Sequence, residues 1–185
     1  MAGTLYTIAA DVKLQVEFNP AKVKYYRLIG YENRLLADSD FNNDQKDAGD
    51  LGAGHAVTAL YEIIPAASDE TAANIDQLIY QQPVLLPNNE YFRIKLRYKK
   101  PAAKESTLFS QSAGPADCLA KPSDNLTWAA AVSEYALLLR NSEFKGKASY
   151  EQVLELAKAA KGKDAEGYSS EFIRLVEITQ LLAGQ

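Results

Sequence analysis

The stretch from residue 27 to residue 65 decides the fold: RLIGYENRLLADSDFNNDQKDAGDLGAGHAVTALYEIIP. Two apolar segments, at residues 28–29 and 57–64, flank a polar loop from residue 38 to residue 50 that contains five Asp and two Asn. The segment 57–64 carries one charge and is bounded by Pro65, which favours a central strand. We therefore predict two strands joined by an acidic loop.

The segments on either side of this stretch show the two-residue period of half-buried strands. Residues 11–18 alternate, and residues 23–31 should return as the second strand of a hairpin after the turn-forming Asn19-Pro20. In segment 11–18 the apolar face is Val12, Leu14, Val16 and Phe18, and the polar face is Lys13, Gln15 and Glu17. In segment 91–99 the inward face is Phe92, Ile94, Leu96 and Tyr98, and the outward face is Arg93, Lys95, Arg97 and Lys99. A short strand at Leu108-Phe109 completes the expected β-rich part.

The period changes to 3.6 residues from Ser123 onward, which indicates helices. The first helix should bury Trp128, Val132, Tyr135, Leu138 and Leu139. The second should begin at Ser149 with a capping box to Gln152 and end at Gly162. The third, over residues 165–182, should bury Tyr168, Phe172, Leu175, Val176 and Thr179. The predicted fold class is α+β: an antiparallel β-sandwich-like core followed by about three C-terminal α-helices.

Composition excludes several classes of protein. The 185 residues suit one domain or two small ones, and the predicted boundaries are a β-rich domain at 11–122 and a helical part packed on the sheet at 123–185. The net charge of -4 provides no field that would recruit nucleic acid. No apolar run is long enough for a direct membrane span, and the N-terminus lacks signal-peptide features. The single cysteine, Cys118, excludes an internal disulfide.

The acidic loop suggests a calcium site, because Asp38, Asp40, Asn42 and Asp44 repeat at every second residue like the first ligands of an EF-hand. The match then fails, since an EF-hand needs Gly at the sixth position and a bidentate Glu at the twelfth. This loop has Asn43 and Gly49 there. The alternative is a solvated loop in which Asp and Asn bond the local backbone. We therefore assign no metal and keep calcium binding as the alternative function.

His55 is the only histidine and the remaining candidate for catalysis. No nucleophile-elbow sequence accompanies it, and a zinc site would require ligands from distant positions. We expect it to begin a strand and to hydrogen-bond the preceding loop. A hydrolase using His55 is the least favoured alternative. The basic face of segment 91–99 is expected to be solvated and not to bind phosphate. No catalytic residue and no cofactor are predicted.

Four segments resemble one bacterial family. These are VEFNPAKVKYYRLIGYENRLL at 16–36, DAGDLGAGHAVTALYEI at 47–63, LLLRNSEFKGKASYEQVLELAKAAKG at 137–162 and GYSSEFIRLVE at 167–177. Together they resemble the domain that follows a von Willebrand factor type A domain in YfbK-type proteins. The first ten residues then resemble the tail of that type A domain, or a linker. The Asp-x-Ser-x-Ser metal motif of a type A domain is absent here.

The resemblance implies a non-catalytic interaction and assembly module, not an enzyme. Its partners would be the neighbouring type A domain and other envelope proteins, and its place the periplasm, outer membrane or cell surface. We also expect weak self-association through an open sheet edge at strand 11–18, with the acidic loop solvated and outside that contact. The candidate binding residues are Asp38, Asp40, Asn42, Asp44 and His55.

Overall fold

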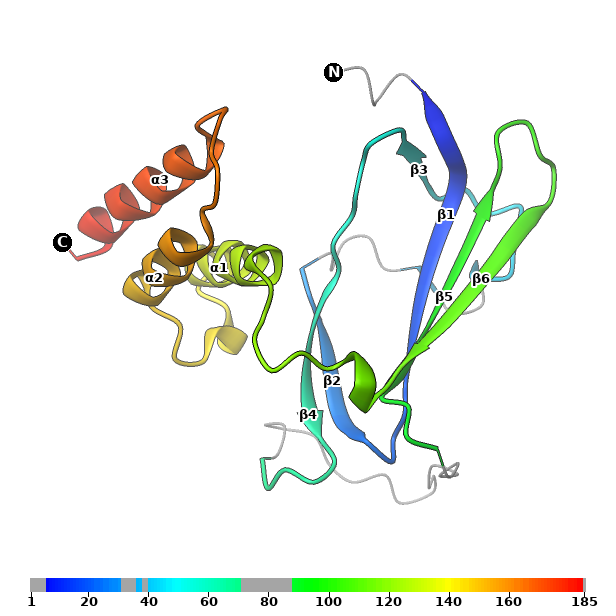
Figure 1. The fold of residues 1–185 in the computed structure, drawn as a ribbon, viewed down its shortest axis with the longest axis horizontal. Helices are drawn as coiled ribbons and strands as arrows, with labels where there is room; N and C mark the ends of the chain where they lie inside the picture. Colours follow the sequence, from blue (N-terminus) through cyan, green and yellow to red (C-terminus); the bar gives the residue numbers. More distant parts are fainter. Residues whose placement is uncertain (1–5, 31–35, 38–39, 71–87, 185) are drawn as a thin grey trace. The chain divides into compact units, whose positions relative to one another are not determined.

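The computed structural model describes residues 6–30, 36–37, 40–70 and 88–184. Within these residues the chain forms two compact units that divide between Cys118 and Leu119. Six β-strands belong to the first unit and three α-helices to the second (Figure 1). The α+β class predicted from the sequence is therefore confirmed.

Four strands form an antiparallel sheet in the order β3-β1-β5-β6. Their bounds are Gly49–Gly52 (β3), Thr7–Phe18 (β1), Phe92–Lys99 (β5) and Ser106–Ala113 (β6). The strands expected at 11–18 and 91–99 are present, and the short strand expected at Leu108-Phe109 is eight residues long. β1 lies between β3 and β5, so the expectation that strand 11–18 is an open edge is wrong. The edges of this sheet, among the described strands, are β3 and β6.

The other two strands, β2 (Val23–Ile29) and β4 (Leu60–Pro65), form a separate antiparallel sheet. The hairpin predicted from segments 11–18 and 23–31 is therefore wrong. Phe18 at the end of β1 stacks on Tyr26 of β2 with ring centroids 4.4 Å apart, and Tyr61 of β4 meets it edge-on at 5.3 Å. These ring contacts join the end of β1 to both strands of the smaller sheet, in the stacked and edge-to-face arrangements that aromatic pairs prefer. The turn after Phe18 thus changes sheet.

The second strand predicted in the acidic stretch is shorter than expected. β4 begins at Leu60, and Val57 is 69% exposed. Residues 53–59 carry the chain from β3 in the larger sheet to β4 in the smaller one, so they cannot extend a strand. Among the described residues β4 pairs only with β2, and the prediction of a central strand is wrong.

The larger sheet has one apolar and one charged face, which follows from its regular register. Leu14 of β1, Leu96 of β5 and Phe109 of β6 lie opposite one another in one row, and Val16 and Ile94 begin the next. The neighbouring rows on the opposite face contain Lys13, Arg97 and Leu108, then Gln15, Lys95 and Ser110. Lys13, predicted to be solvated, is 2% exposed, because residues 40–46 cover this face.

The second unit consists of α1 (Asp124–Leu139), α2 (Tyr150–Ala160) and α3 (Tyr168–Ala183). The short 3-10 helix η5 (Glu143–Lys145) follows α1, and a similar turn, η4 (Pro115–Asp117), ends the first unit. The Ser149 hydroxyl accepts the Gln152 N–H, which confirms the predicted N-cap, and the Ser123 hydroxyl caps α1 in the same way by accepting the Leu126 N–H. Only half of the predicted capping box forms, since the Gln152 amide donates to Glu134 instead.

The core of the helical unit comprises Ala131, Tyr135, Val153, Ala157, Ile173 and Val176, with Trp128, Leu138 and Phe172 packed against it. Val132, Leu139, Tyr168 and Leu175, all predicted to be inward, are exposed. In α1 the small side chain of Ala131 is fully buried, so the buried face includes Ala131 and leaves the neighbouring Val132 exposed. No helix of the described residues is long and apolar enough to cross a membrane.

A hydrogen bond joins α1 to α3 within this core. The Thr179 hydroxyl donates to the Leu175 carbonyl oxygen, so its oxygen accepts the Tyr135 hydroxyl at 2.8 Å. Tyr135→Phe removes this donor and should lower the free energy of unfolding by about 1 kcal/mol. Urea unfolding followed by circular dichroism measures the change. Tyr168→Phe, at a position 73% exposed, is the control and should leave stability unchanged. Equal stabilities for the two variants would contradict the assignment.

Candidate functional site

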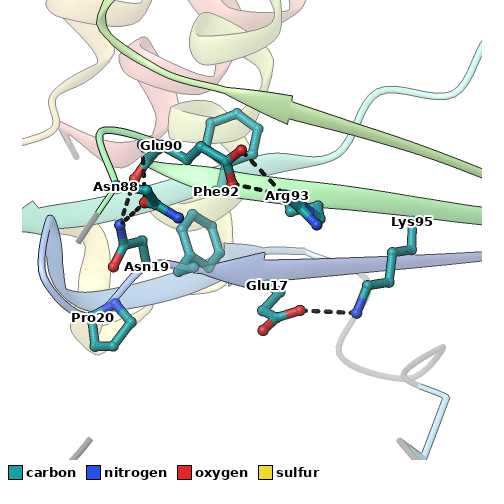
Figure 2. Close-up of a pocket in the computed structure, with 9 residues that line it drawn as sticks. Glu17, Asn19, Pro20, Asn88, Glu90, Phe92, Arg93 and Lys95 are labelled. Atoms are coloured by element: carbon teal, nitrogen blue, oxygen red, sulfur yellow. Dashed lines mark hydrogen bonds and ion pairs between the residues drawn. The ribbon is translucent and has the colours of Figure 1, made fainter. Parts of the chain in front are cut away.

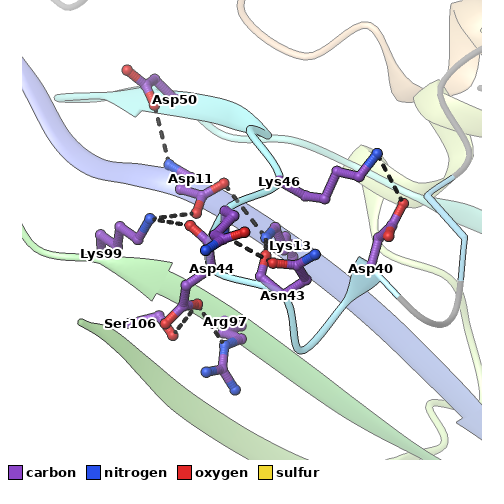
Figure 3. Close-up of polar contacts among 11 residues, drawn as sticks. Asp11, Lys13, Asp40, Asn43, Asp44, Lys46, Asp50, Arg97, Lys99 and Ser106 are labelled. Carbon is purple, nitrogen blue, oxygen red and sulfur yellow. Dashed lines mark hydrogen bonds and ion pairs between the residues drawn. The ribbon is translucent and has the colours of Figure 1, made fainter. Parts of the chain in front are cut away.

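The acidic loop is docked on the charged face of the larger sheet (Figure 3). The Lys13 ammonium donates to the Asn43 carbonyl oxygen at 2.5 Å and lies 3.7 Å from an Asp11 carboxylate oxygen. Lys99 bridges the other Asp11 oxygen and the Asp44 carbonyl oxygen, each at 2.9 Å. Phe41 is buried within the same loop. The expectation that this loop is solvated is therefore wrong for Phe41, which is buried, and for the half-buried Asn43 and Asp44.

Asp44 makes the side-chain contacts that join the loop to two strands. Its Oδ1 accepts Arg97 Nε at 3.2 Å and the Ser106 hydroxyl at 2.8 Å. These hydrogen bonds, the one from Ser106 first and then the one from Arg97, hold the pKa of the Asp44 carboxyl below its ordinary value. Asp44 thus links the loop to β5 and β6.

Local geometry explains why β1 accepts a buried charged pair. Asp11 has φ 55°, and the pairing of β1 shifts register around it against both β3 and β5. Such a bulge re-aims side chains, and Asp tolerates a left-handed backbone better than most residues. The Asp11 amide donates to an Asp50 carboxylate oxygen at 3.1 Å, which joins the bulge to β3. The bulge turns the Asp11 carboxylate toward Lys13 and Lys99.

The four outward cations of β5 are all paired within the chain. Arg93 binds Glu90 at 3.1 Å, and Lys95 binds Glu17 at 2.9 Å. Arg97 and Lys99 bind the loop and the bulge, as described above. The basic face was expected to be solvated. This expectation is wrong for Arg97 and Lys99, whose side chains are 22% and 21% exposed. This face offers no unpaired cationic patch for phosphate.

Among the described candidate residues, Asn42 and Asp44 meet at Arg97, whereas Asp40 and His55 have other partners. Asp38 lies outside the described residues. Asp40 pairs with Lys46 at 3.9 Å, and Asn42 accepts Arg97 at 3.4 Å. His55 is exposed, and its backbone N–H donates to the Gly52 carbonyl oxygen in a turn before β4. It bonds the preceding loop as predicted, but it does not begin the strand.

The geometry of the loop gives no support to the calcium alternative. Asp44 Oδ1 already accepts Arg97 and Ser106, and the Arg97 and Lys99 cations beside Asp44 would repel a bound Ca²⁺. Across the described ranges no three acidic, His or Cys side chains group closely enough to hold a metal ion.

A pocket of about 340 Å³ lies where β1 turns toward β2 and β5 begins (Figure 2). Phe18 and Phe92 line it together with the Glu17–Lys95 and Glu90–Arg93 pairs. The hydrogen bond from Lys95 lowers the pKa of Glu17. Asn19 donates to the Glu90 carbonyl oxygen at 2.7 Å, which ties the turn to β5. The charged side chains named here already pair with each other, and the pocket lining comes from β1, β5 and the segments next to them.

Strand β6 is the surface feature that sequence reasoning missed. The stretch Ser106–Ala113 reads STLFSQSA, with no charge and no proline. Its pairing with β5 shows no register shift over eight residue pairs. Leu108 and Phe109 are 54% and 51% exposed. The absence of charge over eight residues was the signal available in the sequence.

Comparison with known proteins identifies the family of this chain. The family model described as "Uncharacterized protein YfbK, C-terminal" matches residues 3–182. The chain belongs to this family. It is 42% identical to "Uncharacterized protein YfbK" of Escherichia coli (strain K12). The matched region has 182 residues and covers 96% of the chain. The chain spans 31% of that protein's length. No solved structure matches the chain.

Lys13 should control the docking of the loop. Lys13→Met removes the donor to Asn43 and one cation from Asp11, so we expect a loss of about 3 kcal/mol, the lower end for breaking a buried pair, since Lys99 remains. Trypsin should then cut after the exposed Lys46 faster than in the native protein. Denaturant unfolding and a proteolysis time course measure the two effects. Lys163→Met, at an exposed helix-unit position, is the control. Unchanged cleavage at Lys46 would show that another contact holds the loop.

The pKa of Asp44 should report the same docking. The Asp44 pKa is lowered in the folded protein. The carboxylate therefore contributes stability above the unfolded-state pKa of about 3.9, and this contribution is lost as the pH falls through the folded-state pKa. Ser106→Ala should raise the Asp44 pKa toward the ordinary value. Carboxyl carbon chemical shifts followed against pH measure it. Ser110→Ala, in the same strand, should leave it unchanged, and the hypothesis is wrong if both variants behave alike.

Proposed function

We propose that the chain is a non-catalytic interaction and assembly module that follows a von Willebrand factor type A domain in a bacterial envelope or secreted protein. The single observation that carries the proposal is the edge of β6. Every second residue of an edge strand presents its N–H and C=O groups outward, where another strand can pair with them.

Natural sheets usually protect their edges with charges, proline, bulges or short strands. β3, at the other edge, is four residues long and contains Asp50. β6 has eight residues, no charge, no proline and no register shift. Among the described residues β6 pairs only with β5. This lack of protection is typical of a strand that pairs with another chain.

The rest of the proposal comes from the family. The chain spans 31% of its YfbK relative, which is consistent with a module of a longer protein. The type A domain, the envelope location and the envelope partners rest on the resemblance of the four quoted segments. An Asp-x-Ser-x-Ser sequence in the region that precedes this chain in its gene would support the type A assignment.

The two alternatives have less support. The loop carboxylates that calcium would use at Asp40 and Asp44 face cations of the same chain. A hydrolase using His55 would need a nucleophile beside it, and His55 is exposed in a turn outside the pocket lining. The interaction function uses a strand whose edge is available, and for that reason we favour it.

Hydrogen exchange tests the function directly. If β6 binds another strand, its outward amides should exchange at least roughly tenfold more slowly in the longer protein than in this chain at low micromolar concentration. Amides of β5, which has a strand on each side, serve as the internal control and should not change. Mass spectrometry of peptides covering 106–113 measures the rate. Equal β6 exchange in the longer protein and in this chain at every concentration would refute an interaction at this edge.

A further inference from the structure

We propose that β6 binds β6 of a second copy of this chain, antiparallel about a two-fold axis, with Phe109 opposite Phe109. This inference rests on the proposed function, which makes β6 an interaction edge, and it names the partner. The larger sheets of the two copies would then become one continuous sheet of eight strands, four from each copy.

Symmetry restricts the register of such a pair. When the two-fold axis is perpendicular to the sheet, the same face of each copy lies on the same side of the joined sheet. In an antiparallel pair, two residues directly opposite each other point to the same face. Faces alternate along a strand, so a residue can lie opposite only residues an even number of positions away. One residue at the axis therefore lies opposite its own copy. The central candidates are Leu108, Phe109 and Ser110.

The rows across the sheet select Phe109. Its row is Leu14, Leu96 and Phe109, which is apolar and half exposed at both ends. Pairing at Phe109 makes this row continuous across both copies and places two aromatic rings opposite each other. Such cross-strand pairs contribute roughly 0.2–1 kcal/mol beyond Ala–Ala.

A two-fold axis at Leu108 or at Ser110 would instead extend a row that contains polar residues. The Leu108 row contains Lys13 and Arg97, on the face that carries the docked loop. The Ser110 row contains Gln15 and Lys95. A Leu108 centre would bury two leucines but would continue into the cations Arg97 and Lys13, and a Ser110 centre would bury no apolar side chain. Only the Phe109 register extends a row that is apolar throughout.

Charge also favours a second copy. Within Ser106–Ala113 no residue is charged, so no like charges meet in this register. At one end Glu105 lies opposite Ala113 of the partner, and Lys104 lies opposite Gly114. A charged strand would repel its own copy, whereas this neutral one does not.

Sedimentation measures the association. The native chain should shift from monomer to dimer as concentration rises. Phe109→Lys should weaken this dimer at least tenfold, since two ammonium groups would then lie opposite each other. Phe109 is half exposed, so the monomer should remain folded by circular dichroism. Leu119→Lys, a matched change at a position 76% exposed outside the sheets, should dimerise like the native chain.

Cysteine cross-linking tests the register without relying on a Lys variant. In a Cys118→Ala background, Phe109→Cys should link to its own copy with a short thiol-reactive reagent. Leu108→Cys should link efficiently only when mixed with Ser110→Cys, because residues 108 and 110 of the two copies lie opposite each other. Efficient self-linking of Ser110→Cys, with little from Phe109→Cys, would overturn the register.

The two proposals fail in different ways. A strict monomer at every concentration, combined with protected β6 amides in the longer protein, overturns the second copy as partner but keeps β6 as an interaction edge. A dimer that Phe109→Lys leaves intact also overturns this inference. Unprotected β6 amides in the longer protein and in the concentrated chain overturn both.

Discussion

The contact between the Lys13 ammonium and the Asn43 carbonyl oxygen is the constraint on which the β unit depends. Lys13 is 2% exposed, and a buried ammonium is costly unless it has hydrogen-bond and charge partners. Asp11 and the acidic loop supply them. The loop must therefore lie on β1 and β5, which in turn places Asp44 beside Arg97 and Ser106. Of the described loop carboxylates, Asp44 pairs with the basic face beneath it, and Asp40 pairs with Lys46 of the loop itself.

The two sheets meet at the end of β1. Phe18 lies on the face of β1 opposite to Lys13, and it stacks on Tyr26 of the smaller sheet. The chain crosses between the sheets after Phe18 and again over residues 53–59. The hydrogen bond from Asn19 to the Glu90 carbonyl oxygen holds the first crossing against β5. The loop and the aromatic contact therefore act on opposite faces of one strand.

The sequence predicted the elements better than their partners. Alternation identified β1 and β5, and Ser123 and Ser149 marked two helix starts, because these signals are local. Pairing is not local. Alternation in segments 11–18 and 23–31 shows their faces but not which edges join, and the Phe18–Tyr26 stack decided against a hairpin. Lys13 was misassigned because its burial comes from a loop thirty residues later. The buried face of α1 was displaced because Ala131 contributes little to a hydrophobic periodicity although its small side chain permits close packing.

The distribution of charge over the larger sheet explains why the candidate site is an edge and not a pocket. The charged side chains of β1 and β5 discussed above meet partners within the chain, and those partners come from the loop and from neighbouring strands. β6 contributes Ser106 to this network and is otherwise neutral. A solvated edge strand normally needs charge to prevent pairing, and β6 has none although the neighbouring strand carries four cations. A neutral strand beside a strongly charged one is best explained if its outer edge contacts protein, because its outward backbone groups are available and no side-chain charge opposes pairing.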